Sequence, residues 1–232
     1  AEEYDSPEMR AKTSFLFAAD VHNWTQPVRQ SLPYYERAWE LSLQTGDWLT
    51  AGDVVVQAGS DRLTAGVPLS SLCEELTANI HFLEKRNNQD AVLLLRAGVY
   101  QPLRLLLGYS EEGSFDDDAF CEADYEERFA DNSFYLAWLY AGRIRVEFLL
   151  GDPKDFPLWI ERLEIVRTYV PTHAKVPECT FFCILMLLQR AESAERPEEW
   201  HKLLELVADL QRWYEAAPEN LRPRWEIVQA RL

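Results

Sequence analysis

The sequence predicts an all-α fold of about ten helices that pair as antiparallel hairpins. Three observations carry this prediction. Apolar side chains recur at three- and four-residue spacing through most of the 232 residues, which is the period of one helix face. Short connections marked by glycine or proline separate the periodic segments, as they do in helical hairpins. No segment shows the convincing alternation of apolar and polar residues that is typical of a half-buried strand.

The first two helices are predicted at Glu8 to His22 and at Pro27 to Thr45. Ser6 suits the N-cap of the first helix, and Pro7 suits its first position, because the N–H that proline lacks has no helical partner there. In the second helix we expect Pro33 to break the first turn, since proline removes a backbone donor.

Gly46 is expected to end that helix, and Asp47 to cap the next one, which runs from Trp48 to Leu63. The run Asp53 to Val56 contains valines that favour strands. These valines fall within the helical period, so we assign them to the helix.

Two more helices complete the first half of the chain. The first is predicted to begin with Ser70 or Ser71 as its N-cap. The other covers residues 88–107, and Gly98 and Pro102 indicate a bend within it.

The second half has the same periodicity. An amphipathic helix contains Phe134 to Phe148, and a shorter helix follows Pro153. The helix from Val176 to Arg190 is apolar on nearly all sides, so we expect it at the centre of the fold. The last two helices contain the stripe Trp200 to Tyr214 and the segment after Pro218.

Glycine–aspartate pairs at residues 46–47 and 151–152 each end one helix and open another. The pairs are 105 residues apart, about three periods of the roughly 34-residue tetratricopeptide repeat. Ala51 is small, as a close approach of two helices requires. We therefore expect the hairpins to stack as a tetratricopeptide-like superhelix in a single domain over residues 1–232, with a weak division near 108–132 as the alternative.

An acidic segment at residues 111–131 is the one shift in composition, with ten acids and one base. One interpretation is a solvated loop and a short helix whose aromatic side chains pack inward. The other is a docking site for a basic partner, in which Asp116, Asp117 and Asp118 bind. An EF-hand loop starting at Asp116 would need glycine at its sixth position, where this chain has Cys121, so no calcium site is expected.

Charge and cysteine content exclude several functions. The chain has 39 acidic and 23 basic residues and a net charge of −16, which argues against binding to nucleic acid or to an anionic membrane. No run of 18 apolar residues predicts a membrane span. The four cysteines show no CxxC spacing, and a chain of this size needs no disulfide framework, so we expect a reducing, cytoplasmic location.

Motifs of catalysis and cofactor binding are absent. The chain lacks the phosphate-binding loop, the dinucleotide-binding glycines, the zinc-protease and nucleophile-elbow patterns and the kinase signatures. The four histidines have no neighbour at metal-ligand spacing on the same helix. Cys179 and Cys183 are expected to be small buried hydrophobes. We therefore expect no enzyme, no cofactor and no metal.

Eight tryptophans are many for this length, and most should fill gaps between helices. In a repeat superhelix, one or two aromatic residues can instead line the concave face. Trp24, Tyr35 and Trp39 are the candidates for such a groove wall, with packing between hairpins as the alternative. The net charge favours a basic ligand for the groove.

The segment Phe17 to Val55 resembles the helical-repeat region of large bacterial, and some fungal, signalling proteins. These proteins join a serine/threonine kinase, a STAND-type ATPase, a GAF domain and a sensor histidine kinase. The matching positions are His22, Trp24, Pro27, Ala38, Gly46, Asp47 and Ala51, with one residue inserted between the histidine and the tryptophan.

The resemblance continues in order along the chain. It is carried by Leu63 to Leu76, Gln101 to Gly108 and Phe134 to Asp152, and it closes at "APENLRPRWEIVQARL", residues 217–232. The chain departs from the family pattern at Arg222, Arg224 and Arg231.

The resemblance implies a non-catalytic sensor or docking module of a signalling ATPase or kinase. It would bind a protein segment or a small ligand, and we expect a protein partner or a sister domain with a basic surface. The alternative is a structural scaffold that packs against sister domains or a second copy.

Overall fold

The computed structural model describes residues 6–110, 113–191 and 197–232, and these residues form an all-α fold, as predicted. Within these ranges the one β-type pairing is an isolated bridge between Asp117 and Phe120. Glu111 and Glu112, which open the acidic segment, lie outside the described residues.

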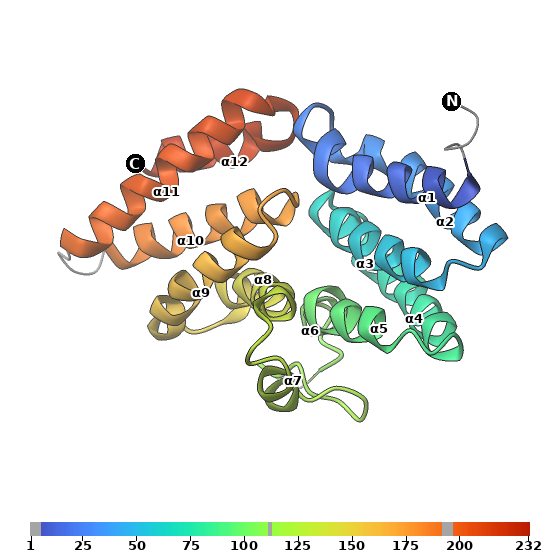
Figure 1. The fold of residues 1–232 in the computed structure, drawn as a ribbon. Coiled ribbons are helices and arrows are strands. Elements are labelled where there is room, and N and C mark those ends of the chain that lie inside the picture. The colour runs from blue at the N-terminus through green and yellow to red at the C-terminus, as the bar shows by residue number, and fades with distance from the viewer. Residues whose placement is uncertain (1–5, 111–112, 192–196) are drawn as a thin grey trace.

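Successive antiparallel helices follow one another around an arc (Figure 1). The first half contains α1 (Pro7–Leu16), α2 (Leu32–Thr45), α3 (Trp48–Thr64), α4 (Leu69–Lys85), α5 (Gln89–Leu95) and α6 (Gln101–Leu106). The second half contains α7 (Glu122–Arg128), α8 (Ser133–Leu150), α9 (Phe156–Tyr169), α10 (Lys175–Ala191), α11 (Pro197–Ala216) and α12 (Pro218–Arg231). Five short helical turns complete the set: η2 (Phe17–Val21), η3 (His22–Trp24), η4 (Val28–Ser31), η5 (Arg96–Tyr100) and η6 (Pro153–Asp155).

Local capping signals set several helix ends where the sequence predicts them. The Ser6 hydroxyl accepts a hydrogen bond from the Met9 N–H, at 3.2 Å, and so caps α1. Gly46 ends α2 with φ at 73°, a conformation that favours glycine, and Asp47 caps α3. The predicted serine cap of α4 is wrong. That helix begins at Leu69, directly after Pro68, because the extended proline (φ −52°, ψ 125°) already directs the chain into the first turn.

The predicted bend near Gly98 and Pro102 coincides with η5, a single π-turn that joins α5 to α6. A π-turn inserts one residue into the helical ladder, which accommodates a proline that cannot donate a hydrogen bond. Helix α8 packs closely against this bend, because Gly98 and Gly142 have no side chains to separate the backbones.

Helices α3 and α10 lie at the centre, and each contacts helices from both halves of the arc. The prediction of a central, buried helix near Val176 to Arg190 is therefore confirmed. One hydrophobic core cluster runs from Val55 to Val228. It includes the aromatic side chains of the acidic segment, which are at most 7% exposed: Phe115, Phe120, Tyr125 and Phe129.

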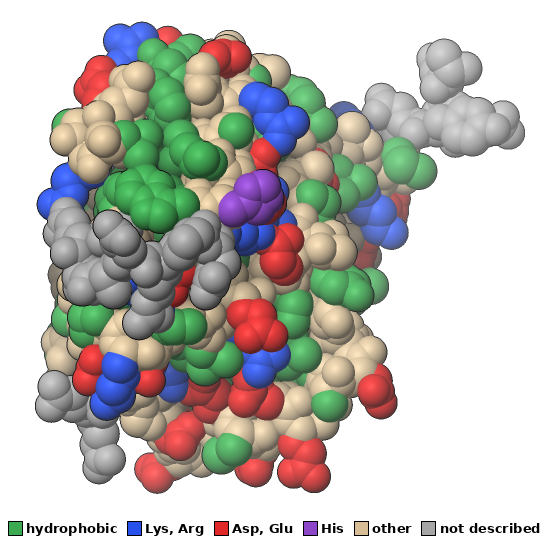
Figure 2. Space-filling view, turned by 90° about the vertical axis from the view of Figure 1, so that its left-hand side faces the viewer, with side chains coloured by type: hydrophobic (Ala, Val, Ile, Leu, Met, Phe, Trp, Pro, Cys, Tyr) green, Lys and Arg blue, Asp and Glu red, His purple; other side chains and the backbone are tan. Residues whose placement is uncertain are grey.

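The surface reflects the excess of acids. Figure 2 shows the molecule from the side that lies at the left in Figure 1. On this face, acidic side chains gather in the lower part, and hydrophobic side chains lie above them. In the described ranges, no helix combines the length and the apolar character that a bilayer crossing requires.

Candidate functional site

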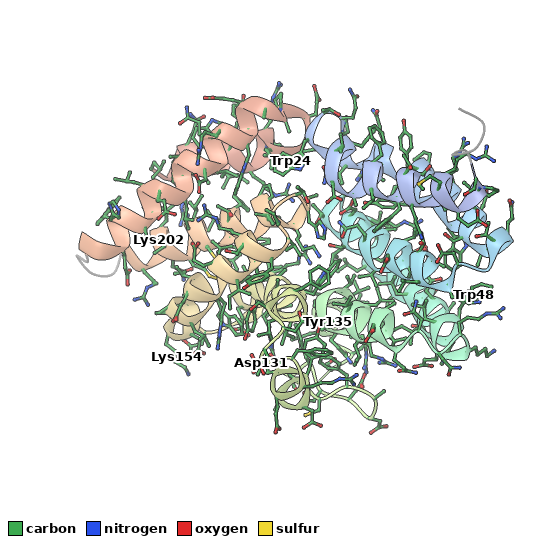
Figure 3. The ribbon with its side chains drawn as sticks, viewed as in Figure 1. Trp24, Trp48, Asp131, Tyr135, Lys154 and Lys202 are labelled. Atoms are coloured by element: carbon green, nitrogen blue, oxygen red, sulfur yellow. The ribbon has the colours of Figure 1, made fainter. Side chains whose placement is uncertain are left out.

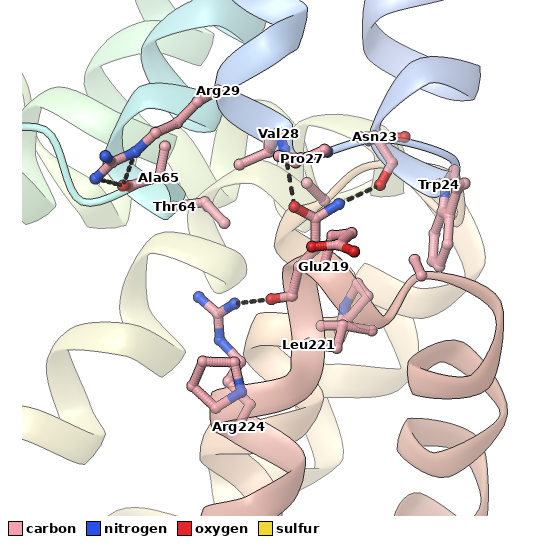
Figure 4. A pocket seen from close by; sticks show the side chains of 15 residues that line it. Asn23, Trp24, Pro27, Val28, Arg29, Thr64, Ala65, Glu219, Leu221 and Arg224 are labelled. Carbon is pink, nitrogen blue, oxygen red and sulfur yellow. Dashed lines mark hydrogen bonds between the residues drawn. The ribbon is translucent and has the colours of Figure 1, made fainter.

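The first and last helical hairpins meet, and the side chain of Asn220 joins them. Asn220 lies in the first turn of α12, and its Oδ1 accepts a hydrogen bond from the Val28 N–H at 2.8 Å. Its Nδ2 donates to the carbonyl oxygens of Asn23, at 2.6 Å (Figure 4), and of Gln26, at 2.9 Å. One side chain thus binds three backbone groups in the turn that links α1 to α2.

Trp24 makes a second connection at the same junction. Its Nε1 donates to the carbonyl oxygen of Thr172, at 2.7 Å, in the loop before α10. Its ring centroid lies 6.3 Å from that of Trp213 on α11. Figure 3 places Trp24 where the N-terminal hairpin meets the last two helices. The first hairpin is therefore fixed to the C-terminal part of the arc at two separate places.

A pocket of about 420 Å³ opens between these two hairpins (Figure 4). Its walls are mainly apolar, and the polar side chains stand at a few positions, as is typical of binding pockets. The lining residues are Asn23, Trp24, Pro27, Val28, Arg29, Thr64, Ala65, Ala174, Pro177, Ala217, Glu219, Asn220, Leu221, Pro223 and Arg224. We call this the closure pocket.

A buried ion cluster lies against the closure pocket, where Thr64 and Arg224 reach its wall. Glu178, on α10, is ion-paired with Arg145 of α8 and with Arg224 of α12, and it accepts a hydrogen bond from the Thr64 hydroxyl at 2.9 Å. Burial alone would raise the pKa of Glu178, but Arg145 and Arg224 offset this and hold the pKa below its usual value. The cluster therefore contains a charged glutamate between two arginines.

Two further buried ionisable side chains lie deeper in the fold. The Asp61 carboxylate is fully buried and accepts hydrogen bonds from the Tyr35 hydroxyl, at 2.6 Å, and from Gln57, at 3.0 Å. Burial raises the pKa of Asp61 to about 7. Lys175 is also buried and lies over the Trp138 ring, and its Nζ has no hydrogen-bond partner among the described residues. Burial lowers the pKa of Lys175 well below its usual value.

The three aromatic residues predicted to line a groove do not share one site. Trp24 lines the closure pocket. Tyr35 is only 2% exposed, and its hydroxyl donates a hydrogen bond to Asp61. Trp39 packs against Phe82, with ring centroids 5.1 Å apart. Tyr35 and Trp39 together line a smaller pocket, of about 160 Å³, among α2, α3 and α4.

The three neighbouring aspartates have different environments. Asp117 is ion-paired with Arg104 and accepts a hydrogen bond from Gln101 at 2.8 Å. Burial would raise the pKa of Asp117, but the hydrogen bonds and arginines around it lower that pKa. Asp116 is exposed, and its carboxylate accepts a hydrogen bond from the Glu122 N–H at 2.8 Å. Asp118 is exposed and faces two shallow surface pockets.

Sequence reasoning singled out Trp24 but missed the other polar residues of the closure pocket. Asn23 and Asn220 lie 197 positions apart, so no local pattern links them. The available signal was the family resemblance, because its opening motif at residues 22–27 and its closing "APEN" at residues 217–220 form opposite sides of this pocket.

Comparisons with known proteins find no match among family models, curated proteins or solved structures. Among the residues that the structure describes, no group of three or more His, Cys, Asp or Glu side chains is placed to hold a metal ion.

Proposed function

We propose that this chain is a non-catalytic docking module of a larger signalling protein of the ATPase or kinase class, and that it binds a protein segment in the closure pocket. The observation that carries this proposal is the pocket itself, which the first and last hairpins build together. A ligand there contacts both ends of the arc at once. Binding would therefore stabilise the closed arrangement, and a binding equilibrium of this kind can bias a larger protein between two states.

The chemistry of the pocket supports binding over catalysis. Its walls combine Trp24 and aliphatic side chains with amide and guanidinium groups, which bind peptides, and Glu219 and Thr64 add one carboxylate and one hydroxyl. The two cysteines of α10 are buried, and burial raises the pKa of Cys179 to about 12, so its thiol is unreactive. The parent architecture is proposed on the resemblance described above.

Selection from a peptide display library on the purified chain tests the docking function. Ala174 lies in the pocket wall and is partly exposed, so Ala174→Trp fills the pocket with little strain on the core. Ala130 is exposed and outside the pocket, and Ala130→Trp adds the same side chain there. We expect the selected peptides to bind the wild-type chain and the Ala130→Trp variant equally, and to lose at least about tenfold in affinity on Ala174→Trp, about 1.4 kcal/mol.

Peptides that bind equally well to the wild type and to Ala174→Trp would contradict the docking function of this pocket. Circular dichroism of both variants shows whether each keeps the wild-type helical content.

An exposed apolar group on the first hairpin favours the scaffold function as a second candidate. Leu16, Phe17, Val21 and Tyr34 are 37–52% exposed, and the rings of Phe17 and Tyr34 lie 5.0 Å apart. A sister domain or a second copy that covers this surface would bury it. In that case, Val21→Asp would weaken association, whereas Ala174→Trp would leave it unchanged.

A further inference from the structure

The loop before α10 holds the first hairpin through one residue, Thr172. Its carbonyl oxygen accepts hydrogen bonds from Trp24 Nε1, at 2.7 Å, and more weakly from Asn23 Nδ2, at 3.4 Å. Its hydroxyl donates to the carboxylate of Asp20 at 2.5 Å. Asp20, Asn23 and Trp24 all lie in the two short turns, η2 and η3, that follow α1. Any change that displaces this loop therefore loosens the contact between the first hairpin and α10.

His173 directly follows Thr172, and its ring is buried beside this contact. The side chain is 15% exposed, and the ring makes an edge-on contact with Trp138, with centroids 5.7 Å apart. Its Nδ1 is buried and has no hydrogen-bond partner among the described residues. A proton added to this ring would place a charge in a site that water does not reach, which is costly. The geometry therefore suits a neutral imidazole.

The charged groups around His173 come from three elements. Asp20, on η2, has its Oδ1 3.8 Å from His173 Nε2, which is too long for a hydrogen bond. Lys175, on α10, is buried nearby, and Asp61, on α3, faces Lys175. Helix α8 contributes the uncharged ring of Trp138. Burial lowers the pKa of His173 well below its usual value, and Lys175 adds to this effect.

The other three histidines have different environments. His22 is also buried, but its Nδ1 lies 2.9 Å from the Ser31 hydroxyl and so has a partner. His81 and His201 are exposed. Within the described part of the chain, His173 is thus the one histidine with a buried ring nitrogen that has no partner.

We infer that His173 makes the contact between the first hairpin and the α10 loop sensitive to acid. In the closed contact the ring stays neutral. In a loosened form the ring meets water, and it takes up a proton once the pH falls below about 6.5. Acid therefore shifts the equilibrium toward the loosened form, by up to about tenfold per pH unit. This inference goes beyond the docking function, and its test uses no ligand, so each can fail without the other.

Hydrogen exchange of the Trp24 indole N–H, which is bonded to the Thr172 carbonyl, provides the test. The chain is labelled with ¹⁵N-tryptophan, and Trp24→Phe identifies the resonance. Protection is the exchange rate of N-acetyl-tryptophanamide divided by that of Trp24 at the same pH. We expect protection to fall at least fivefold between pH 7.5 and 5.0, within the limit of about thirtyfold for one proton. Circular dichroism should show the same helical content at both pH values.

Matched variants show whether His173 is responsible. His173→Phe keeps a ring against Trp138 but cannot take up a proton, so its protection should change less than twofold over this range. His201→Phe removes an exposed histidine and should behave as the wild type. Asp20→Asn keeps an oxygen for the Thr172 hydroxyl and removes the charge that attracts a protonated His173. Its loss of protection in acid should be at least as large as that of the wild type.

Two outcomes would overturn the inference. Protection that stays constant or rises between pH 7.5 and 5.0 in the wild type would show that the closed contact tolerates a protonated His173, as a pairing with Asp20 would allow. An equal loss of protection in the wild type and in His173→Phe would assign the acid sensitivity to another group, such as His22.

Discussion

The amide side chain of Asn220 joins the first and last hairpins through three hydrogen bonds, and its removal should be costly. Asn220→Ala deletes three hydrogen bonds to the turn between α1 and α2. Each such bond contributes about 1 kcal/mol, and the groups that it leaves behind are partly buried, so we expect a loss of about 2–4 kcal/mol in the free energy of unfolding. Urea titration measures this loss.

Asn132 offers a control for this substitution. It is exposed and makes no side-chain capping bond at the start of α8, so Asn132→Ala should change stability by less than about 0.5 kcal/mol. Equal losses for the two variants would mean that Asn220 does not hold the first and last hairpins together.

The buried carboxylate of Asp61 should make stability depend on pH. Burial raises the pKa of Asp61 to about 7, whereas the pKa of an aspartate in an unfolded chain is about 3.9. Between these values the folded chain keeps the Asp61 proton and the unfolded chain loses it. The contribution of Asp61 to the free energy of unfolding is therefore present at low pH. It is lost as the pH rises toward 7, by at most about 1.4 kcal/mol per pH unit.

The comparison with Asp61→Asn isolates this effect from other titrating groups. The difference in unfolding free energy, wild type minus variant, should fall as the pH rises from 5 to 7. A difference that stays constant over this range, or that rises, would show that Asp61 is ionised in the folded chain, as a charged pairing with Lys175 would require.

At the scale of elements, the contact between α8 and the α5–α6 bend depends on two glycines. A Cβ at position 142 would lie 2.6 Å from Pro102 Cγ and 3.0 Å from the Ala97 carbonyl oxygen. Because the backbone oxygen cannot move aside, Gly142→Ala should destabilise the chain by about 1–3 kcal/mol, measured by thermal or urea unfolding.

Gly59, in the middle of α3, is the matched control for the glycine substitution. A Cβ there would meet the end of the Leu76 side chain at 3.2 Å, and that side chain can shift. Since alanine favours a helix over glycine by about 1 kcal/mol, Gly59→Ala should be neutral or stabilising. A neutral Gly142→Ala would show that the two helices lie farther apart than described.

Element boundaries were predictable where a local side chain sets them. Ser6, Gly46 and Asp47 act on backbone groups within a few residues, so the sequence alone indicates their roles. The start of α4 was not predicted, because the chain takes its direction from Pro68, before the serines expected to cap it. The aromatic residues of the acidic segment pack into the core, as the interpretation of that segment as a loop and a short helix predicts.

At the scale of the whole molecule, the periodicity of the sequence predicts the helical fold, but it does not predict the contact between the first and last hairpins. The bonds of Asn220 span more than 190 residues, and no propensity or spacing reports on contacts of that range. For the same reason, the sequence does not show that Trp24 lines one pocket and that Tyr35 and Trp39 line another. It also does not indicate the polar residues of the closure pocket.

The distance between the first and last hairpins in solution tests the central claim most directly. Gln26 and Arg222 are exposed on either side of the closure, so Gln26→Cys and Arg222→Cys can carry spin labels, with Cys121→Ser to remove the one free cysteine that is not buried. Pulsed electron–electron double resonance should give one short, narrow distribution of distances between the two spin labels. The Asn220→Ala substitution should broaden this distribution toward longer distances. A broad or long distribution in the chain with Asn220 intact would show that the first and last hairpins do not meet, and would contradict the closure pocket and the function proposed for it.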